Sequence, residues 1–245
     1  MTTKGNAIPI IKIICDDIAE QIRSGATAPG TKLPSERELG DNRRISRMTA
    51  RRIYERLESE GLVSRSHRRG WFVAEARLQF ALMKSVSFIN SAAVRGRDAR
   101  ALLLGAEKII PPEFAREQLK LRRNEEALFV RRVLQLGDRP AAIETMYLTH
   151  VRFPNFLDHP LTGSILSLWQ DVYGITVGHA DATLRGTFLS DEDADLLSVS
   201  KGSPTIVLTQ TMVDHTGEPF AYDRQDWRFE LAEFLISADF EQANN

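Results

Sequence analysis

Three helix patterns followed by two short strand patterns occupy residues 9–73, and this order restricts the fold more than any other feature of the chain. Isoleucines that recur at helical spacing predict an amphipathic helix over residues 9–23. Ser35 and Glu38 have the form of a capping box, which predicts that a second, short helix starts there. The first forty residues therefore predict a pair of helices joined by a turn.

A third helix is predicted from Ser46, which can cap it, to Glu60. Two short strands follow at 62–66 and 70–73, joined by a turn at 67–69. Three helices and a strand pair within about seventy residues are typical of a winged helix-turn-helix, which places one helix in the DNA major groove.

The third helix has two different faces. Its apolar arc, predicted to face the core, holds Ala50, Ile53, Tyr54 and Leu57. Its opposite arc holds Met48, Arg51, Arg52, Glu55 and Arg56. The arginines are interpreted as a DNA-contacting surface, although they also have the spacing to pair with Glu55 on a solvated face.

Charge is distributed unevenly along the chain. The 245 residues carry a net charge of −1, which divides into +4 on residues 1–75 and −5 on the remainder. Nine arginines and three glutamates fall within residues 43–69. Such a basic zone is the electrostatic signature of phosphate binding. On charge alone, a solvated surface explains it equally well.

The chain is predicted to contain two domains. Residues 1–75 form the DNA-binding domain, 76–98 a linker and 99–240 a second domain. Short strand and helix patterns alternate beyond the linker, with hairpin turns at 137–138 and 214–217. The predicted class is α+β, with an antiparallel sheet in the second domain.

Several classes of protein are disfavoured. No apolar run is long enough to span a bilayer, no signal peptide is recognisable, and Cys15 has no partner for an internal disulfide, so we expect a cytoplasmic protein without a membrane partner. The histidines show no metal-ligand spacing, and phosphate-loop and nucleophile-elbow motifs are absent. We expect no cofactor, no metal and no catalytic residue. An enzyme of lyase-like fold with an accessory DNA-binding head stays as an alternative, as does a scaffolding protein.

The first domain resembles the GntR family of transcription regulators. Four blocks carry the resemblance in order: 30–39 (GTKLPSEREL), 45–51 (ISRMTAR), 57–63 (LESEGLV) and 69–73 (RGWFV). The resemblance implies DNA contacts within and beside these four blocks. Basic residues that lie next to the implied contacts are added to the predicted set. The predicted set is Arg37, Arg43, Arg44, Ser46, Arg47, Met48, Thr49, Arg51, Arg52, His67, Arg68, Arg69 and Gly70.

Two departures from the family pattern affect the geometry of this predicted interface. Arg43 and Arg44 stand where the family usually has Leu-Gly, in the turn before the third helix. Arg68 replaces the usual glycine of the wing. The first departure is expected either to add phosphate contacts or to change the turn.

The second domain resembles the UTRA effector domain of the HutC subfamily, whose fold is similar to chorismate lyase. The matching stretches are Arg132 through 144–147 (ETMY), 163–166 (GSIL) and 201–204 (KGSP). The resemblance implies a small-molecule pocket. The predicted effector contacts are Arg132, Glu144, Tyr147, Ser164, Trp227 and Arg228. Arg132 and Glu144 are equally well explained as a cross-strand ion pair.

The sequence leads to one functional hypothesis. The chain is predicted to be a homodimeric repressor that binds palindromic double-stranded DNA and is released by a small, anionic effector. Residues 68–73, 75–78 and 161–164 resemble regulators of phosphonate uptake and use. Regulation of amino-acid (histidine-type) or sugar-phosphate catabolism is the alternative. Ala221 and Leu134 argue against a sugar phosphate, because many relatives have an acid and an arginine at these positions.

Overall fold

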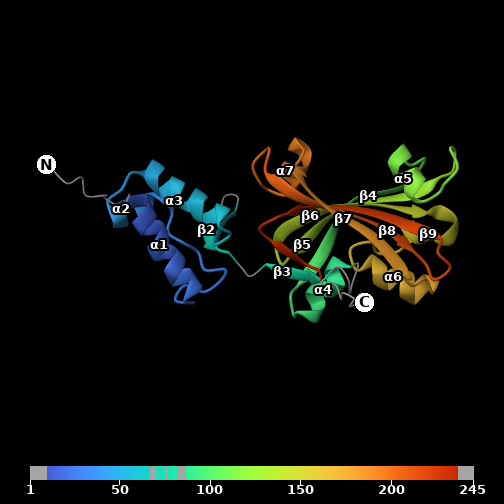
Figure 1. The fold of residues 1–245 in the computed structure, drawn as a ribbon, viewed down its shortest axis with the longest axis horizontal. Helices are drawn as coiled ribbons and strands as arrows, with labels where there is room; N and C mark the ends of the chain where they lie inside the picture. Colours follow the sequence, from blue (N-terminus) through green and yellow to red (C-terminus); the bar gives the residue numbers. More distant parts are fainter. Residues whose placement is uncertain (1–9, 67–69, 75–76, 82–86, 237–245) are drawn as a thin grey trace, which may run out of the picture. The chain divides into compact units, whose positions relative to one another are not determined.

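The computed structural model describes residues 10–66, 70–74, 77–81 and 87–236. Contacts between Cα atoms divide the chain into two compact units, Met1–Ala76 and Arg77–Asn245. Each unit is described by itself below (Figure 1). None of the described helices has the length and apolar character of a membrane span.

The first unit has the predicted order of three helices and a strand pair. Its elements are α1 (Ile10–Arg23), α2 (Glu36–Arg43), α3 (Arg47–Ser59), β1 (Val63–Ser66) and β2 (Gly70–Val73). The strands β1 and β2 are antiparallel. The Ser35 capping box is present in full, since Ser35 accepts from the Glu38 N–H and Glu38 accepts from the Ser35 N–H.

Packing of the first unit is organised around Tyr54. The predicted apolar arc of α3 is completely enclosed, because its four residues are at most 1% exposed. The Tyr54 ring stacks on Trp71 of β2, with 5.0 Å between centroids. Its hydroxyl donates to the Pro34 carbonyl oxygen over 2.7 Å. One side chain thus joins α3, the wing and the segment before α2, and the opposite arc of α3 is left exposed.

The second unit is built on a six-stranded antiparallel sheet with the order β4-β5-β6-β9-β8-β7. Its strands are β4 (Ala99–Ile109), β5 (Ala127–Leu136), β6 (Arg139–Thr149), β7 (His179–Phe188), β8 (Pro204–Val213) and β9 (Pro219–Arg228). Both predicted hairpins, β5–β6 and β8–β9, are therefore present. Together the two units confirm the predicted α+β class.

Helices cover both faces of the sheet (Figure 1). Helices α4 (Phe88–Val94) and α6 (Ile165–Tyr173) lie on one face, and α5 (Glu113–Gln118) and α7 (Asp191–Leu196) lie on the other. The face under α4 and α6 carries two apolar clusters, one around Trp227 and one around Trp169. Successive strand residues point to opposite faces, and Val133 and Ile143 accordingly pack with Ala194 of α7 on the other face.

The segment predicted as a linker contains regular structure. Residues 78–81 form β3 (Leu78–Ala81), which pairs in parallel with β10 (Ala232–Leu235), and α4 lies between β3 and β4. Leu78, Phe80 and Phe88 are at most 3% exposed and pack in the cluster around Trp227. Sequence patterns missed β3 and α4 because both are short. The partner strand of β3, β10, also lies far away in the sequence.

Candidate functional site

The turn between α2 and α3 positions the end of α3 that is predicted to contact DNA. Arg44 in this turn has a left-handed backbone, with φ 53° and ψ 45°. The Ile45 N–H donates to the Gly40 carbonyl oxygen over 3.0 Å, which closes the turn. Glycine normally fills such a position after a helix. The arginine therefore keeps the turn geometry that glycine would give, at a cost of about 1–2 kcal/mol.

The first turn of α3 is capped and exposed. Ser46 accepts from the Thr49 N–H over 3.1 Å, and the two hydroxyls lie 2.8 Å apart. Met48 is 62% exposed. Capping thus fixes the backbone of Arg47 and Met48 while both side chains face solvent.

Half of the exposed arginines near this turn already have acidic partners. Arg43 pairs with Asp17 of α1, Arg47 with Glu36 over 3.2 Å, and Arg51 with Glu55 over 2.8 Å. Within the described residues Arg37, Arg44 and Arg52 form no such pair. Exposed pairs contribute only about 0–1 kcal/mol, so phosphate can replace the carboxylates at little cost.

The tip of the predicted wing is described only in part. His67, Arg68 and Arg69 lie outside the described residues. Gly70 has φ 103°, a backbone that side chains rarely adopt. The Arg65 guanidinium lies 5.8 Å from the centre of the Trp71 ring. Trp71, anchored by Tyr54, therefore fixes the base of the wing.

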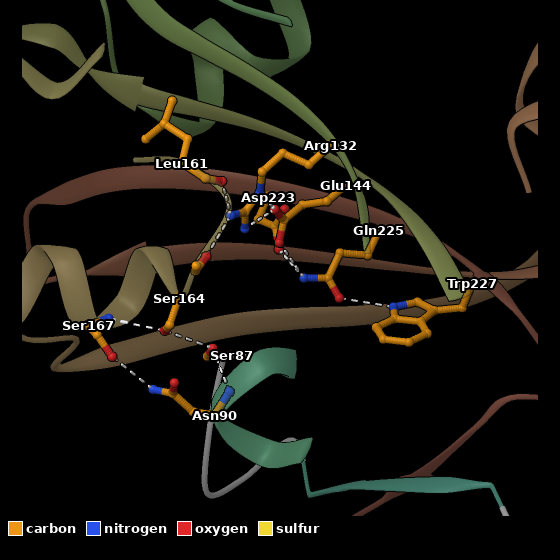
Figure 2. A network of polar contacts seen from close by, with 11 residues as sticks. Ser87, Asn90, Arg132, Glu144, Leu161, Ser164, Ser167, Asp223, Gln225 and Trp227 are labelled. Atoms are coloured by element: carbon orange, nitrogen blue, oxygen red, sulfur yellow. Dashed lines mark hydrogen bonds and ion pairs between the residues drawn. The ribbon is translucent and has the colours of Figure 1, made fainter. Parts of the chain in front are cut away.

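In the second unit, Arg132 and Glu144 form a buried ion pair across β5 and β6 (Figure 2). Their exposed fractions are 3% and 5%. Arg132 Nη1 also donates to the carbonyl oxygens of Leu161 and Gly163, over 2.7 and 2.8 Å. The guanidinium is thus held by Glu144 and by two carbonyl oxygens, and it fixes the loop that leads into α6.

A polar band continues from this pair onto β9. Gln225 Nε2 donates to Glu144 over 3.2 Å and to Asp223 over 2.7 Å, while its carbonyl oxygen accepts from Trp227 Nε1 over 2.9 Å. Burial raises the pKa of Asp223 well above its ordinary value, and the nearby Glu144 carboxylate raises it further. The band therefore holds two buried carboxyl groups and one guanidinium.

Hydroxyl groups gather at the start of α6 (Figure 2). Ser164 caps the helix by accepting from the Ser167 N–H over 3.2 Å. The Ser164 hydroxyl lies 3.2 Å from that of Ser87, the residue that caps α4. Asn90 Nδ2 donates to Ser167 over 3.4 Å. These contacts join α4 to the N-terminal end of α6, where the helix dipole favours negative charge.

A cavity lies between this hydroxyl cluster and the ion pair. Its volume is about 20 Å³, enough for about one water molecule. It brings together three of the predicted effector residues, Arg132, Glu144 and Ser164. The other residues that line it are Ser87, Phe88, Ile89, Leu134, Met146, Ile165, Leu166, Trp169 and Met212.

The other three predicted effector residues do not line this cavity. Tyr147 points to the opposite face of the sheet, since it is three residues from Glu144 along β6, and packs with Phe129 and Phe114. Arg228 is also held elsewhere, by Glu230 and by the carbonyl oxygens of Pro140 and Leu197. Trp227 is fully buried in the apolar cluster and reaches the site only through Gln225.

The sequence prediction missed the wall of the cavity that Ser87, Phe88 and Ile89 form at the start of α4. Ser87 was placed in the linker, although its N-cap position and the Phe88–Ala92 spacing are helix signals. Asp223 and Gln225 were also missed. Alternation along β9 gives the signal for them, because they share a face with Trp227.

Two family models match this chain. The model for "UTRA domain" matches residues 94–232, which is more than half of the chain. The model for "Bacterial regulatory proteins, gntR family" matches residues 11–73. The matches fall on the two structural units and confirm the resemblance found in the sequence. They support a DNA-binding regulator with an effector-binding domain and not the lyase-like enzyme.

Similar curated proteins extend over nearly the same length. The "HTH-type transcriptional repressor NagR" of Bacillus subtilis is 27% identical over 236 residues, covering 96% of this chain and 97% of that protein. The "Mannosyl-D-glycerate transport/metabolism system repressor MngR" of Escherichia coli is 25% identical over 232 residues, covering 94% of this chain and 96% of that protein.

Solved structures share the fold at lower identity. PhnF from Mycobacterium smegmatis has a TM-score of 0.67 and 20% identity, covering 95% of this chain and 100% of that one. The possible regulator YydK of Bacillus subtilis has a TM-score of 0.58 and 21% identity, covering 94% of this chain and 99% of that one. Family models, relatives and fold agree: the chain belongs to the gntR family of bacterial regulatory proteins and carries a UTRA domain as its second unit.

Proposed function

We propose that this protein is a cytoplasmic repressor that leaves its operator when a small molecule enters the cavity beside Arg132. One observation carries the DNA-binding part of the proposal. The first turn of α3 is capped by Ser46 and presents Arg47 and Met48 to solvent. Residues at the start of a recognition helix reach base edges in the major groove. The names of NagR and MngR describe both relatives as repressors.

We assign the contacts by position. Arg47 is suited to a bidentate contact with guanine, and Met48 to a thymine methyl group. Phosphates suit the arginines that have no acidic partner among the described residues, namely Arg37, Arg44 and Arg52. Arg43 and Arg51 can also bind phosphates, which then replace the carboxylates of Asp17 and Glu55. Phosphate contacts position the protein, and base contacts give it sequence preference.

We infer that two copies bind one palindromic operator. One recognition helix contacts only a few base pairs, so a second helix on a symmetric half-site raises specificity. The test is the mass of the protein–operator complex by sedimentation. Two chains for each duplex is the expected result, and one chain at saturating protein would contradict it.

The effector is proposed to be a small anion with its charged group at the start of α6. Ser164, Ser167 and the helix dipole attract negative charge there. Glu144, at the other end of the site, repels it. A phosphonate is the first candidate; amino-acid derivatives and sugar phosphates are the alternatives, and the MngR name speaks of mannosyl-D-glycerate for that relative.

Release from DNA is proposed to start at the Ser87–Ser164 contact. The cavity holds about one water, so an effector has to displace part of its wall. A ligand that takes the Ser164 hydroxyl competes with Ser87 and so loosens α4. Helix α4 and strand β3 are the first elements of the second unit after the DNA-binding unit along the chain.

The proposal is tested in two steps. First, fluorescence anisotropy compares DNA from upstream of the protein's own gene with a shuffled duplex of equal composition. Equal affinity for both would contradict sequence-specific binding. Second, a thermal-shift screen of the three effector classes finds the compound that raises Tm, because ligand binding stabilises the folded state by mass action. Linkage requires that this compound and the operator weaken each other by the same factor; a stabilising compound without that effect would contradict release.

A further inference from the structure

A cleft of about 230 Å³ lies on the face of the sheet opposite the effector cavity, beside α5. Its floor is formed by Thr209, Thr211 and Tyr222, which share a face with Tyr147 and point away from Glu144. Phe114, Glu117, Gln118, Asp181 and Thr183 complete the lining. Pockets for drug-sized ligands measure about 300–1,000 Å³, so this cleft suits a smaller molecule.

Phe114 gives the cleft an exposed aromatic surface of fixed orientation. Its side chain is 51% exposed, whereas Ala115 of the same helix is buried against the sheet. The ring makes edge contacts with Tyr147 and Tyr222, with centroids 6.0 and 5.7 Å away. These contacts hold the ring in place while part of it stays in solvent. Phe188, which is 71% exposed, makes no ring contact with another described residue.

The remaining lining is polar and carries unused hydrogen-bonding groups. In the part of the chain that the structure describes, the hydroxyls of Thr183, Thr209 and Tyr222 form no hydrogen bond. The Glu117 carboxylate also has no partner there. Gln118, by contrast, is fixed by the Thr211 hydroxyl, which donates to its carbonyl oxygen over 2.7 Å. Among the described residues that line the cleft there is no lysine or arginine.

We propose that this cleft is a second small-molecule site, which takes the uncharged ring of a carbohydrate. A sugar ring has a face of C–H groups with partial positive charge, and the negative face of an aromatic ring attracts them. Its hydroxyl groups both donate and accept, so they suit threonine, tyrosine and glutamine side chains as well as the acceptor Glu117. Glu117 and Asp181 repel phosphate or carboxylate groups. The inference does not depend on the function proposed for the effector cavity.

The test is titration of the full-length protein with glucose, galactose and mannose, followed by ligand-observed saturation-transfer NMR. At least one neutral hexose is expected to bind in the millimolar range. Phe114→Ala should weaken that binding about tenfold or more, equivalent to about 1.4 kcal/mol. Phe188→Ala is the matched control, since it removes an exposed phenylalanine of the same unit outside the cleft.

A second pair of variants tests the polar wall. Glu117→Gln should weaken the same hexose, whereas Glu113→Gln on the same helix should not. Circular dichroism checks that each variant keeps the parent Tm. The proposal is overturned if none of the three hexoses binds, or if Phe114→Ala and Phe188→Ala behave alike. It is also overturned if Phe114→Ala alters the sedimentation mass, because the cleft would then be an interface between copies.

Discussion

Arg132 and Glu144 are ion-paired across neighbouring strands, and the same guanidinium binds two carbonyl oxygens of the loop that precedes Ser164. Arg132 therefore has its charge neutralised before any ligand arrives. Its position indicates that it holds the start of α6 in place for an effector. The two explanations that the sequence left open, an ion pair and a pocket residue, are thus compatible.

Arg132→Ala should destabilise the second unit by about 3–5 kcal/mol, because it leaves the Glu144 carboxylate buried without its partner. Urea unfolding measures the loss. The double variant Arg132→Met/Glu144→Met should recover most of the stability, since both charges are gone. We expect operator binding by the double variant to be normal and release by effector to be lost. A double variant still released by effector would remove the pair from the effector site.

Arg47→Ala should weaken operator binding by about 1–3 kcal/mol and relax base preference at one position of each half-site. The physical reason is the loss of a base contact at the exposed start of α3. Anisotropy titration against a set of singly substituted operators measures both effects. Equal losses on all of these duplexes would assign Arg47 to phosphate.

Arg43→Ala should lower affinity for all DNA sequences alike and reduce the salt dependence of binding by about one counterion. Because Arg43 pairs with Asp17 in the free protein, Asp17→Asn is the informative companion. It should raise DNA affinity by releasing the guanidinium. If the slope of log K against log salt is unchanged in Arg43→Ala, Arg43 makes no phosphate contact and only pairs with Asp17 of α1.

Arg44→Gly should stabilise the first unit by about 1 kcal/mol, because glycine adopts the left-handed backbone of this turn without strain. Thermal unfolding measures the gain. Gly40→Ala is the opposing variant, as its Cβ would lie 3.0 Å from the Ile45 carbonyl oxygen. If Arg44→Gly lowers Tm instead, contacts of the Arg44 side chain stabilise the unit by more than its left-handed backbone destabilises it.

The unfolding free energy of the second unit should fall as pH rises, because the buried Asp223 loses its proton. Its pKa is raised on folding, so the folded state binds the proton more tightly than the unfolded state. This contribution is complete below the unfolded pKa of about 4 and is lost as pH rises through the folded pKa. Asp223→Asn, which does not ionise, should remove this component. Parallel curves of unfolding free energy against pH for parent and variant would contradict the assignment.

Local patterns predicted the DNA-binding unit well because its determinants are close in sequence. The partners in the Ser35–Glu38 and Ser46–Thr49 caps are three positions apart, and the buried arc of α3 follows the helical period. The effector site was predicted less well. Tyr147 and Arg228 were assigned to it, but strand alternation and contacts with α5 and α7 direct them to the other face.

The sequence by itself determined the two domains, the α+β class, the capped α3 and the Arg132–Glu144 register, because each depends on short-range periodicity or on one tight hairpin. Only the tertiary structure decided which residues enclose the effector cavity. Its α4 wall comes from a segment with no strong pattern, and its floor unites strands that are far apart in the chain. Which side chains meet there depends on strand order and on the face that each helix covers, and neither is encoded in local spacing.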